Sequence, residues 1–170
     1  NFIKMNGLGN DFVIIDQRNE PFQLNENQIK TVCDRKQGIG CDQLIYIRNS
    51  DQNELCLMKF FNSSGEEISA CGNGTRCVAN YLMTEIDSNE IKINTIEKIV
   101  SCKKLEDNLI SVEMGKPKFH WDEIPLSHDV KQDVPTFKLG EKLITNPFFV
   151  NIGNPHVIFF INDINDYNID

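Results

Sequence analysis

The chain has 170 residues, of which 40% are apolar and 25% are charged, as is ordinary for a folded globular protein, so bulk disorder is not expected. The formal net charge is −8 and lysine and arginine do not cluster, which argues against a nucleic-acid-binding surface. Apolar runs are too short to cross a bilayer, and the first residues do not resemble a signal peptide. A cytoplasmic protein that does not enter membranes is therefore expected.

Six cysteines raise the question of disulfides and metal sites. They occupy positions 33, 41, 56, 71, 77 and 102. Without a secretory signal, reduced thiols are expected. No C-x-x-C pair occurs, so the spacing does not favour zinc, and no metal is predicted. Most of these cysteines should be small buried apolar residues, and the open question is whether one of them has a chemical role.

Short runs rich in β-branched and aromatic residues predict strands along the first two thirds of the chain. They lie at residues 12–15, 43–47, 55–61, 91–96 and 109–114. Turn-forming residues separate these runs, and Asn-Ser-Ser-Gly at 62–65 is predicted to be a hairpin loop.

Two segments have the periodicity of amphipathic helices. The first covers residues 25–34 and begins with Asn25 as a candidate N-cap, and the second covers residues 73–84. The predicted buried faces consist of Ile29, Val32 and Cys33 in the first helix and of Cys77, Val78, Tyr81 and Leu82 in the second. Both faces should pack against strands.

The character of the chain changes at about residue 116. Three prolines and weak periodicity predict an irregular connection, after which strand-like character returns over residues 141–163. The sequence therefore predicts an α+β protein with a first domain at 1–115 and the beginning of a second at 116–170.

The stretch Cys-Gly-Asn-Gly at 71–74 lies where the second helix should begin. A helix N-terminus exposes unpaired N–H groups and the positive end of the helix dipole, and glycines let a ligand approach closely, so a carboxylate would fit this turn. The same potential favours a thiolate at Cys71. A thiolate beside a bound carboxylate indicates proton removal or nucleophilic attack at the adjoining carbon. The alternative is a buried cysteine beside a glycine-rich loop.

Five separated stretches, in one order, resemble the N-terminal part of diaminopimelate epimerases. They are KMNGLGNDFVIID (4–16), DRKQGIGCDQLI (34–45), FFNSSGEE (60–67), ACGNGTRC (70–77) and GNPH (153–156). The resemblance covers nearly the whole chain. It implies two similar α+β halves, each a curved antiparallel sheet wrapped around a central helix, with the first half complete or nearly so here and the second partial.

The resemblance also implies an isomerase that interconverts LL- and meso-diaminopimelate for lysine and cell-wall synthesis, without pyridoxal phosphate, another cofactor or a metal. In that family one cysteine thiolate removes the α-proton, and a second thiol returns a proton to the opposite face. Cys71 matches the first cysteine, and Gly72 and Asn73 match the turn that holds the substrate's α-carboxylate.

The remaining site residues are carried over from the same resemblance. Four residues match family residues that make polar contacts to the substrate, namely Asn10, Gln43, Asn62 and Asn154. His156 matches a histidine that tunes the protonation of the cysteines. Without the resemblance, each of these residues would be interpreted as a turn residue, a solvated polar side chain or a hydrogen-bonded imidazole without a functional role.

Two alternatives remain open on the sequence. One is a racemase of the proline or hydroxyproline type with the same fold, although such enzymes carry histidine where this chain has Asn73. PhzF-like isomerases share the fold but lack the cysteine pair. The other alternative is a non-catalytic binding fragment, and a homodimer is left open in every case.

The purified 170-residue chain alone is expected to be inactive or very weakly active. No counterpart of the second catalytic turn occurs, and Cys77 and Cys102 lie in a helix face and a strand context that do not replace it. Racemisation at the α-carbon of LL-diaminopimelate is the measurement. Robust conversion to the meso isomer would contradict the expectation.

Overall fold

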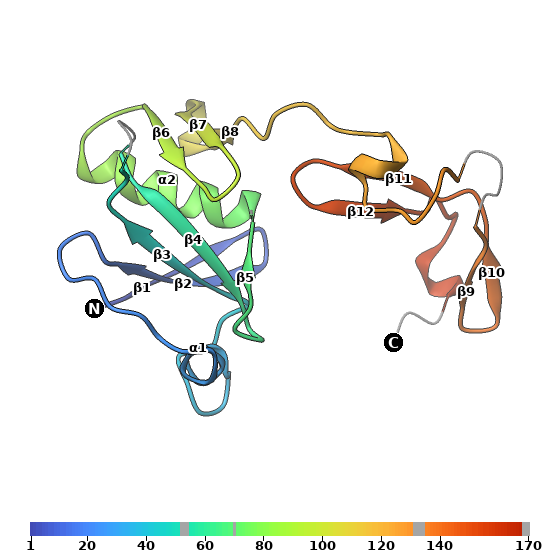
Figure 1. The fold of residues 1–170 in the computed structure, drawn as a ribbon, viewed down its shortest axis with the longest axis horizontal. Helices are drawn as coiled ribbons and strands as arrows, with labels where there is room; N and C mark the ends of the chain where they lie inside the picture. Colours follow the sequence, from blue (N-terminus) through green and yellow to red (C-terminus); the bar gives the residue numbers. More distant parts are fainter. Residues whose placement is uncertain (52–54, 70, 131–134, 168–170) are drawn as a thin grey trace. The chain divides into compact units, whose positions relative to one another are not determined.

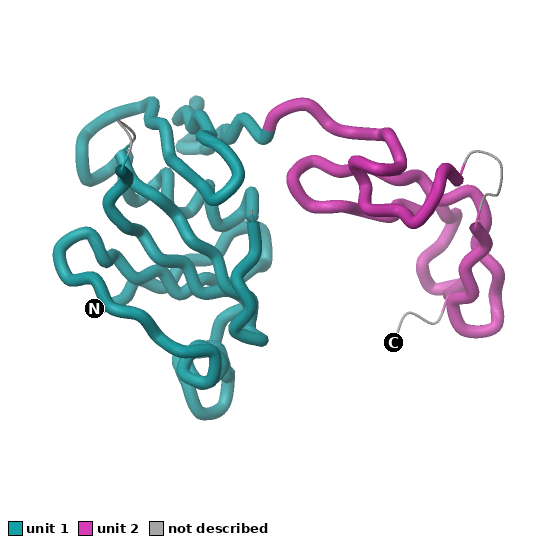
Figure 2. Tube along the Cα trace, in the orientation of Figure 1, with its two compact units in different colours: residues 1–114 teal, residues 115–170 magenta. Residues whose placement is uncertain are grey.

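The computed structural model describes residues 1–51, 55–69, 71–130 and 135–167, and these residues divide into two compact units (Figure 1). Unit 1 covers residues 1–114 and unit 2 covers residues 115–170 (Figure 2). Within the described ranges, the main sheet and both α-helices belong to unit 1. No helix among the described residues is long and apolar enough to cross a membrane.

Unit 1 is built on one eight-stranded sheet with the order β1-β2-β3-β4-β6-β7-β8, in which β5 pairs with β4. The strands are β1 (Ile3–Gly7), β2 (Asn10–Asp16), β3 (Gln43–Arg48), β4 (Leu57–Asn62), β5 (Glu67–Ile68), β6 (Glu90–Asn94), β7 (Ile99–Lys104) and β8 (Ile110–Val112). Each of the five predicted strand segments overlaps one of these strands. The predicted hairpin loop at 62–65 joins β4 to β5, and Gly65 N donates to Asn62 O at 2.9 Å.

The α+β class is confirmed, but the sheet is mixed rather than wholly antiparallel. Strands β2 and β3 are parallel, and so are β4 and β6. Each parallel pair is joined by a connection that contains a helix, because the chain must return to the end of the sheet from which it started. Helix α1 (Glu26–Cys33) follows β2, and α2 (Gly72–Glu85) precedes β6.

The sheet wraps around α2. This helix contacts β1 and β2 at one end of the strand order and β6, β7 and β8 at the other end, which requires a strongly curved sheet (Figure 1). Both predicted helices are confirmed. Helix α1 begins with a capping box, in which Asn25 Oδ1 accepts from Gln28 N at 3.0 Å and Gln28 Oε1 accepts from Asn25 N at 2.9 Å.

Strands β2 and β3 are buried on both faces, which explains why their sequences are almost continuously apolar. In β2, Phe12 and Ile14 belong to the core cluster that contains the buried face of α2. The alternate residues Val13 and Ile15 belong to a second cluster, which contains the buried face of α1. The two helices therefore cover opposite faces of the same strands.

Unit 2 contains two hairpins and short 3₁₀ turns. Strands β9 (Phe137–Leu139) and β10 (Lys142–Ile144) form one hairpin, and β11 (Phe148–Asn151) and β12 (Pro155–Ile158) form the other. Among the described residues, the 3₁₀ turns are η1 (Glu106–Asn108) in unit 1 and η2 (Trp121–Glu123) and η3 (Ile164–Asp166) in unit 2. Large apolar side chains of unit 2 are exposed, including Leu143 at 67% and Phe160 at 85%.

Truncating Leu82 to alanine should lower the free energy of unfolding by about 2–5 kcal/mol, because this fully buried side chain of α2 fills the core between the ends of the sheet. Urea denaturation followed by far-UV circular dichroism measures the change. Thr84→Ala is the matched control on the exposed face of the same helix, and it should shift the value by no more than about 0.5 kcal/mol. Equal losses in the two variants would contradict the core position of Leu82.

Candidate active site

Cys71 is the N-cap residue of α2. Its Sγ accepts a hydrogen bond from Gly74 N at 3.4 Å, while its carbonyl oxygen accepts from Thr75 N at 2.8 Å and from Thr75 Oγ1 at 2.9 Å. The sulfur thus occupies the position in which a hydroxyl or carboxylate oxygen usually accepts from the first turn of a helix. The three hydrogen bonds fix the residue at the positive end of the helix dipole.

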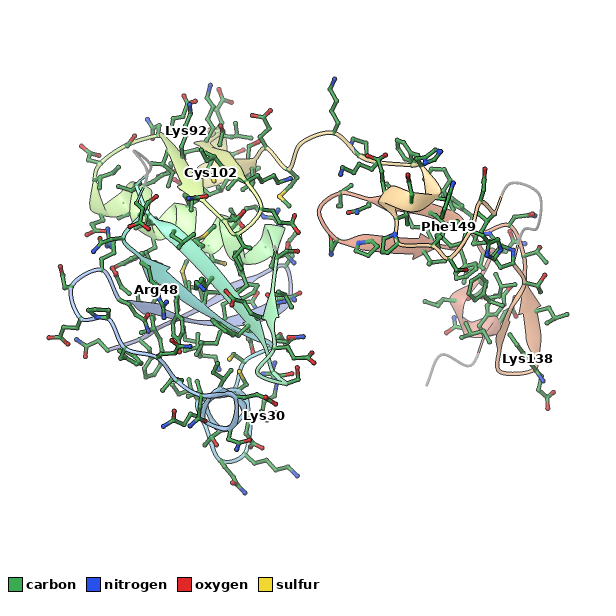
Figure 3. All side chains as sticks on the ribbon, viewed as in Figure 1. Lys30, Arg48, Lys92, Cys102, Lys138 and Phe149 are labelled. Carbon is green, nitrogen blue, oxygen red and sulfur yellow. The ribbon has the colours of Figure 1, made fainter. Side chains whose placement is uncertain are left out.

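Cys71 is also set apart from the other cysteines by its exposure. It is partly exposed, whereas Cys33, Cys41, Cys56, Cys77 and Cys102 are buried, and all six are free thiols. Cys102, labelled in Figure 3, lies in β7 inside the main core. Burial raises the pKa of Cys102 to about 11 and that of Cys56 to about 12. Of the six cysteines in unit 1, Cys71 is therefore the one whose side chain is partly exposed to solvent.

Glycine at position 74 lets the helix start rest directly on the sheet. A Cβ there would lie 2.8 Å from Ile45 Cδ1 and 3.1 Å from Phe60 Cε1, so a side chain at this position would require either these two side chains or α2 to move. At Gly72 the situation is the opposite, because a Cβ would have no neighbour closer than 3.8 Å. The turn is therefore packed on its inner side at Gly74 and open on its outer side at Gly72.

Asn73 is held between two polar side chains. Its Oδ1 accepts from an Nη atom of Arg76, and its Nδ2 donates to Asn10 Oδ1 at 3.4 Å. Because a guanidinium can only donate, this contact fixes which end of the amide faces Asn10. Arg76 was not among the residues selected from the sequence, although the spacing of three residues along a helix would have placed it beside Asn73.

The tip of the β1–β2 hairpin brings Asn10 to the start of α2. Leu8 and Gly9 form the two-residue turn, both with positive φ (54° and 90°), which matches the twist of the flanking strands. Gly7 pairs with Asn10 across the hairpin, and a Cβ at Gly7 would lie 3.2 Å from Asn73 O. The hairpin tip and the helix start are thus in close contact.

A single guanidinium joins this hairpin to the loop before β3. Arg35 donates to Asp11 Oδ2 at 2.8 Å and to Asp42 Oδ1 at 2.9 Å. The loop and the hairpin also bond directly, because Asp11 N donates to Asp42 Oδ2 at 2.8 Å and Asp42 N donates to Asp11 O at 2.9 Å. Asp11 follows Asn10 and Asp42 precedes Gln43, so this clamp sets the spacing between two of the candidate substrate contacts.

Gln43 and Asn62 face each other across β3 and β4, where they are register partners. Gln43 Oε1 and Asn62 Oδ1 are both buried, and neither has a hydrogen-bond partner among the described residues. A buried acceptor without a donor costs free energy, so this pair is suited to a ligand that brings its own N–H groups.

Asn154 and His156 lie together in unit 2. Asn154 is exposed in the loop between β11 and β12, and its carbonyl oxygen accepts from Ile152 N at 3.3 Å and lies 2.8 Å from His156 Nδ1. His156 is exposed in β12 opposite Val150. The structure thus groups Asn10, Gly72 and Asn73 with Cys71 in unit 1, pairs Gln43 with Asn62, and places Asn154 and His156 in the other unit.

The described residues show no group of three or more His, Cys, Asp and Glu side chains arranged to hold a metal ion.

The fold is similar to that of a solved epimerase. A hydroxyproline epimerase from Agrobacterium vitis superimposes with a TM-score of 0.65 at 8% sequence identity, covering 93% of this chain and 50% of that one. At such low identity the similarity concerns the fold alone. It shows that this chain has an α+β fold of the same kind as that protein.

The sequence comparisons give the family. The model of the family described as diaminopimelate epimerase matches residues 2–120. The diaminopimelate epimerase of Pelagibacter ubique is 44% identical over 169 residues, which cover 98% of this chain and 61% of that protein. The enzyme of Phenylobacterium zucineum is 42% identical over 165 residues, covering 95% and 59%. This chain belongs to the diaminopimelate epimerase family, and it spans about 60% of the length of these curated relatives.

Replacing Arg35 with glutamine should raise the pKa of Asp11. In the native chain, hydrogen bonds from Arg35 and then Asn6 hold this pKa below its ordinary value of 3.8. Since the folded pKa is the lower one, the pair stabilises the fold at pH values above 3.8 and loses that effect as the pH falls through the folded pKa. An NMR titration of the carboxyl carbons measures the change.

Asp34 serves as the internal control in the same titration. Its pKa is lowered by main-chain hydrogen bonds from Gln37 and then Lys36, which the substitution leaves in place, so it should move much less than that of Asp11. An unchanged Asp11 pKa in Arg35→Gln, or equal shifts at both carboxylates, would contradict the clamp.

Proposed function

We propose that this chain carries the first catalytic half of a diaminopimelate epimerase, which interconverts LL- and meso-diaminopimelate by proton transfer at the α-carbon. The observation that carries the proposal is Cys71, an accessible thiol fixed as the N-cap of α2 in a chain of this family. Cys71 acts as one of the two acid–base groups.

The turn at 71–74 supplies what this chemistry requires. An α-proton is very weakly acidic, so the negative charge that develops on its removal must meet fixed dipoles. The free N–H groups at the start of α2 bind the substrate's α-carboxylate at the open side of Gly72 and Asn73. The carboxylate then lies beside the sulfur, with the α-carbon within its reach.

Polar side chains of unit 1 select the substrate. The unpartnered acceptors of Gln43 and Asn62 receive N–H groups from the distal amino acid centre, and Asn10 contributes from the hairpin tip. Such a site discriminates against shorter analogues, because their binding would leave these buried acceptors unpaired.

The opposite face of the substrate belongs to the second half of the enzyme. Residues 1–115 correspond to the first half and residues 116–170 to the beginning of the second. Asn154 contributes one further substrate contact, and His156 tunes the protonation of the thiols. The thiol that returns the proton lies in the part of the relatives' length that this chain does not span, since the other five cysteines here are buried.

We further propose that the enzyme is cytoplasmic, keeps its thiols reduced and uses no pyridoxal phosphate. We also propose that two copies of the chain associate, and the exposed apolar side chains of unit 2 support this. The hydroxyproline epimerase alternative shares the fold at only 8% identity, whereas relatives at 44% and 42% identity are diaminopimelate epimerases. The diaminopimelate assignment is therefore preferred.

Alkylation of Cys71 tests the proposal in this chain. Iodoacetamide should modify Cys71 several-fold faster than a reference cysteine at the exposed position 111, introduced by Ser111→Cys in a Cys71→Ser background. The reference separates activation from mere exposure, because both thiols are accessible. Peptide mass spectrometry at pH 7 measures the two rates, and equal rates would count against an activated thiol.

Ligand protection tests the substrate in the same assay. Millimolar LL-diaminopimelate should slow alkylation of Cys71 but not of the reference cysteine, because the bound carboxylate covers the open side of the turn. Protection by trans-4-hydroxyproline instead would favour the racemase alternative. If neither compound protects Cys71, unit 1 does not form the carboxylate site by itself.

A further inference from the structure

A second pair of thiols lies apart from the candidate active site. Cys33 is the last residue of α1 and Cys41 lies in the loop before β3, and their Sγ atoms are 3.4 Å apart. Both side chains are buried, with 4% and 2% of their surface exposed. They belong to the core cluster on the α1 side of the sheet, whereas Cys71 packs against the cluster on the α2 side.

The main chain holds the two thiols together. Cys41 N donates to Cys33 O at 3.1 Å, and Ile39 N and Gly40 N both donate to Val32 O at 3.0 Å. These bonds fold the loop after α1 back onto the last turn of the helix. The backbone therefore holds positions 33 and 41 close enough for their side chains to meet.

Glycine at position 38 makes this return possible. A Cβ there would lie 1.9 Å from Thr31 O and 2.7 Å from Val32 O, so no other residue fits without moving the backbone. Gly40 has a φ of 78°, which favours glycine as well. Two glycines in this loop are thus required by the conformation that brings position 41 beside position 33.

We propose that Cys33 and Cys41 are a thiol modification site, which hydrogen peroxide converts into a disulfide. The Cys41 sulfur attacks one peroxide oxygen, the O–O bond breaks, and a sulfenic acid and one water are formed. The Cys33 sulfur then attacks the Cys41 sulfur, the S–S bond forms, and the hydroxyl leaves with the Cys33 proton as a second water. Two thiols lose two electrons and two protons, and one peroxide is reduced to two waters.

The geometry needs only a small adjustment, since the sulfurs must approach from 3.4 Å to about 2.05 Å.

The order of attack follows from the electrostatics. The hydrogen bond between Cys41 Sγ and Cys33 Sγ, together with a main-chain bond from Val13, lowers the pKa of Cys41 against the opposing effect of burial, while the same bond and burial raise the pKa of Cys33. Cys41 is therefore the more nucleophilic sulfur, and Cys33 is the resolving thiol.

The pair adjoins the clamp described above, because Cys41 precedes Asp42 and Gln43 in the chain. Its chemistry does not require the proposed epimerase function, since the Cys71 thiol takes no part in it. A failure of one proposal therefore leaves the other standing.

Peptide mapping after oxidation tests the inference in the full chain. The native protein is treated with hydrogen peroxide, remaining thiols are alkylated in denaturant, and the digest is analysed by mass spectrometry. Trypsin cuts after Arg35 and Lys36, so Cys33 and Cys41 fall in separate peptides, 31–35 and 37–48. The expected result is a linked pair of these peptides, lighter than their sum by two hydrogens, which dithiothreitol separates again.

Two variants complete the design. Cys33→Ala should lose the linked pair, whereas Cys56→Ala, which also removes a fully buried thiol, should keep it. The proposal is overturned if peroxide leaves both thiols free. It is also overturned if peroxide gives only unlinked sulfinic or sulfonic acid at these positions, or joins either cysteine to Cys71 instead. Because the linked peptide is read in the parent chain, an unfolded variant does not obscure the result.

Discussion

The contact of Gly74 with the sheet is the constraint on which the rest of unit 1 depends. Since Ile45 and Phe60 leave no room for a side chain there, the first turn of α2 lies flush against the strands. That position presses the helix start against the β1–β2 hairpin and sets the amide of Asn73 opposite Asn10. The cysteine before the helix then has little freedom, because its carbonyl and its sulfur are both bonded to the first turn.

The sequence was sufficient for the parts of the fold that depend on local pattern. Both helices have a clear apolar face, and β2 and β3 are continuous apolar runs because helices cover both of their faces. The alternating run of β1 was missed, since five residues ending in Asn-Gly resemble the turn that follows them. The parallel pairing of β2 with β3 was also missed, because it depends on where α1 packs and not on the strand sequences.

The residues of the candidate site also fall into two groups, those that local sequence identifies and those that only the folded structure brings together. Cys71 and the glycines beside it could be selected from local physics, because a helix start has the same electrostatics in any fold. The contacts made by Arg35 could not, since they join positions 24 and 7 residues away across two loops whose approach is a product of folding. Asn154 and His156 lie on a hairpin of unit 2, whereas Cys71 belongs to unit 1. Their proposed roles therefore rest on the resemblance to the family and not on contacts with the thiol.

The curvature of the sheet around α2 has a consequence for biosynthesis. As the chain leaves the ribosome, α2 can meet β1 and β2 at once, because both precede it. Its contacts with β6, β7 and β8 must wait until residues 90–112 have emerged. Until then one flank of the helix is exposed to water, and nascent chains halted in that interval would be vulnerable to proteases and would attract chaperones.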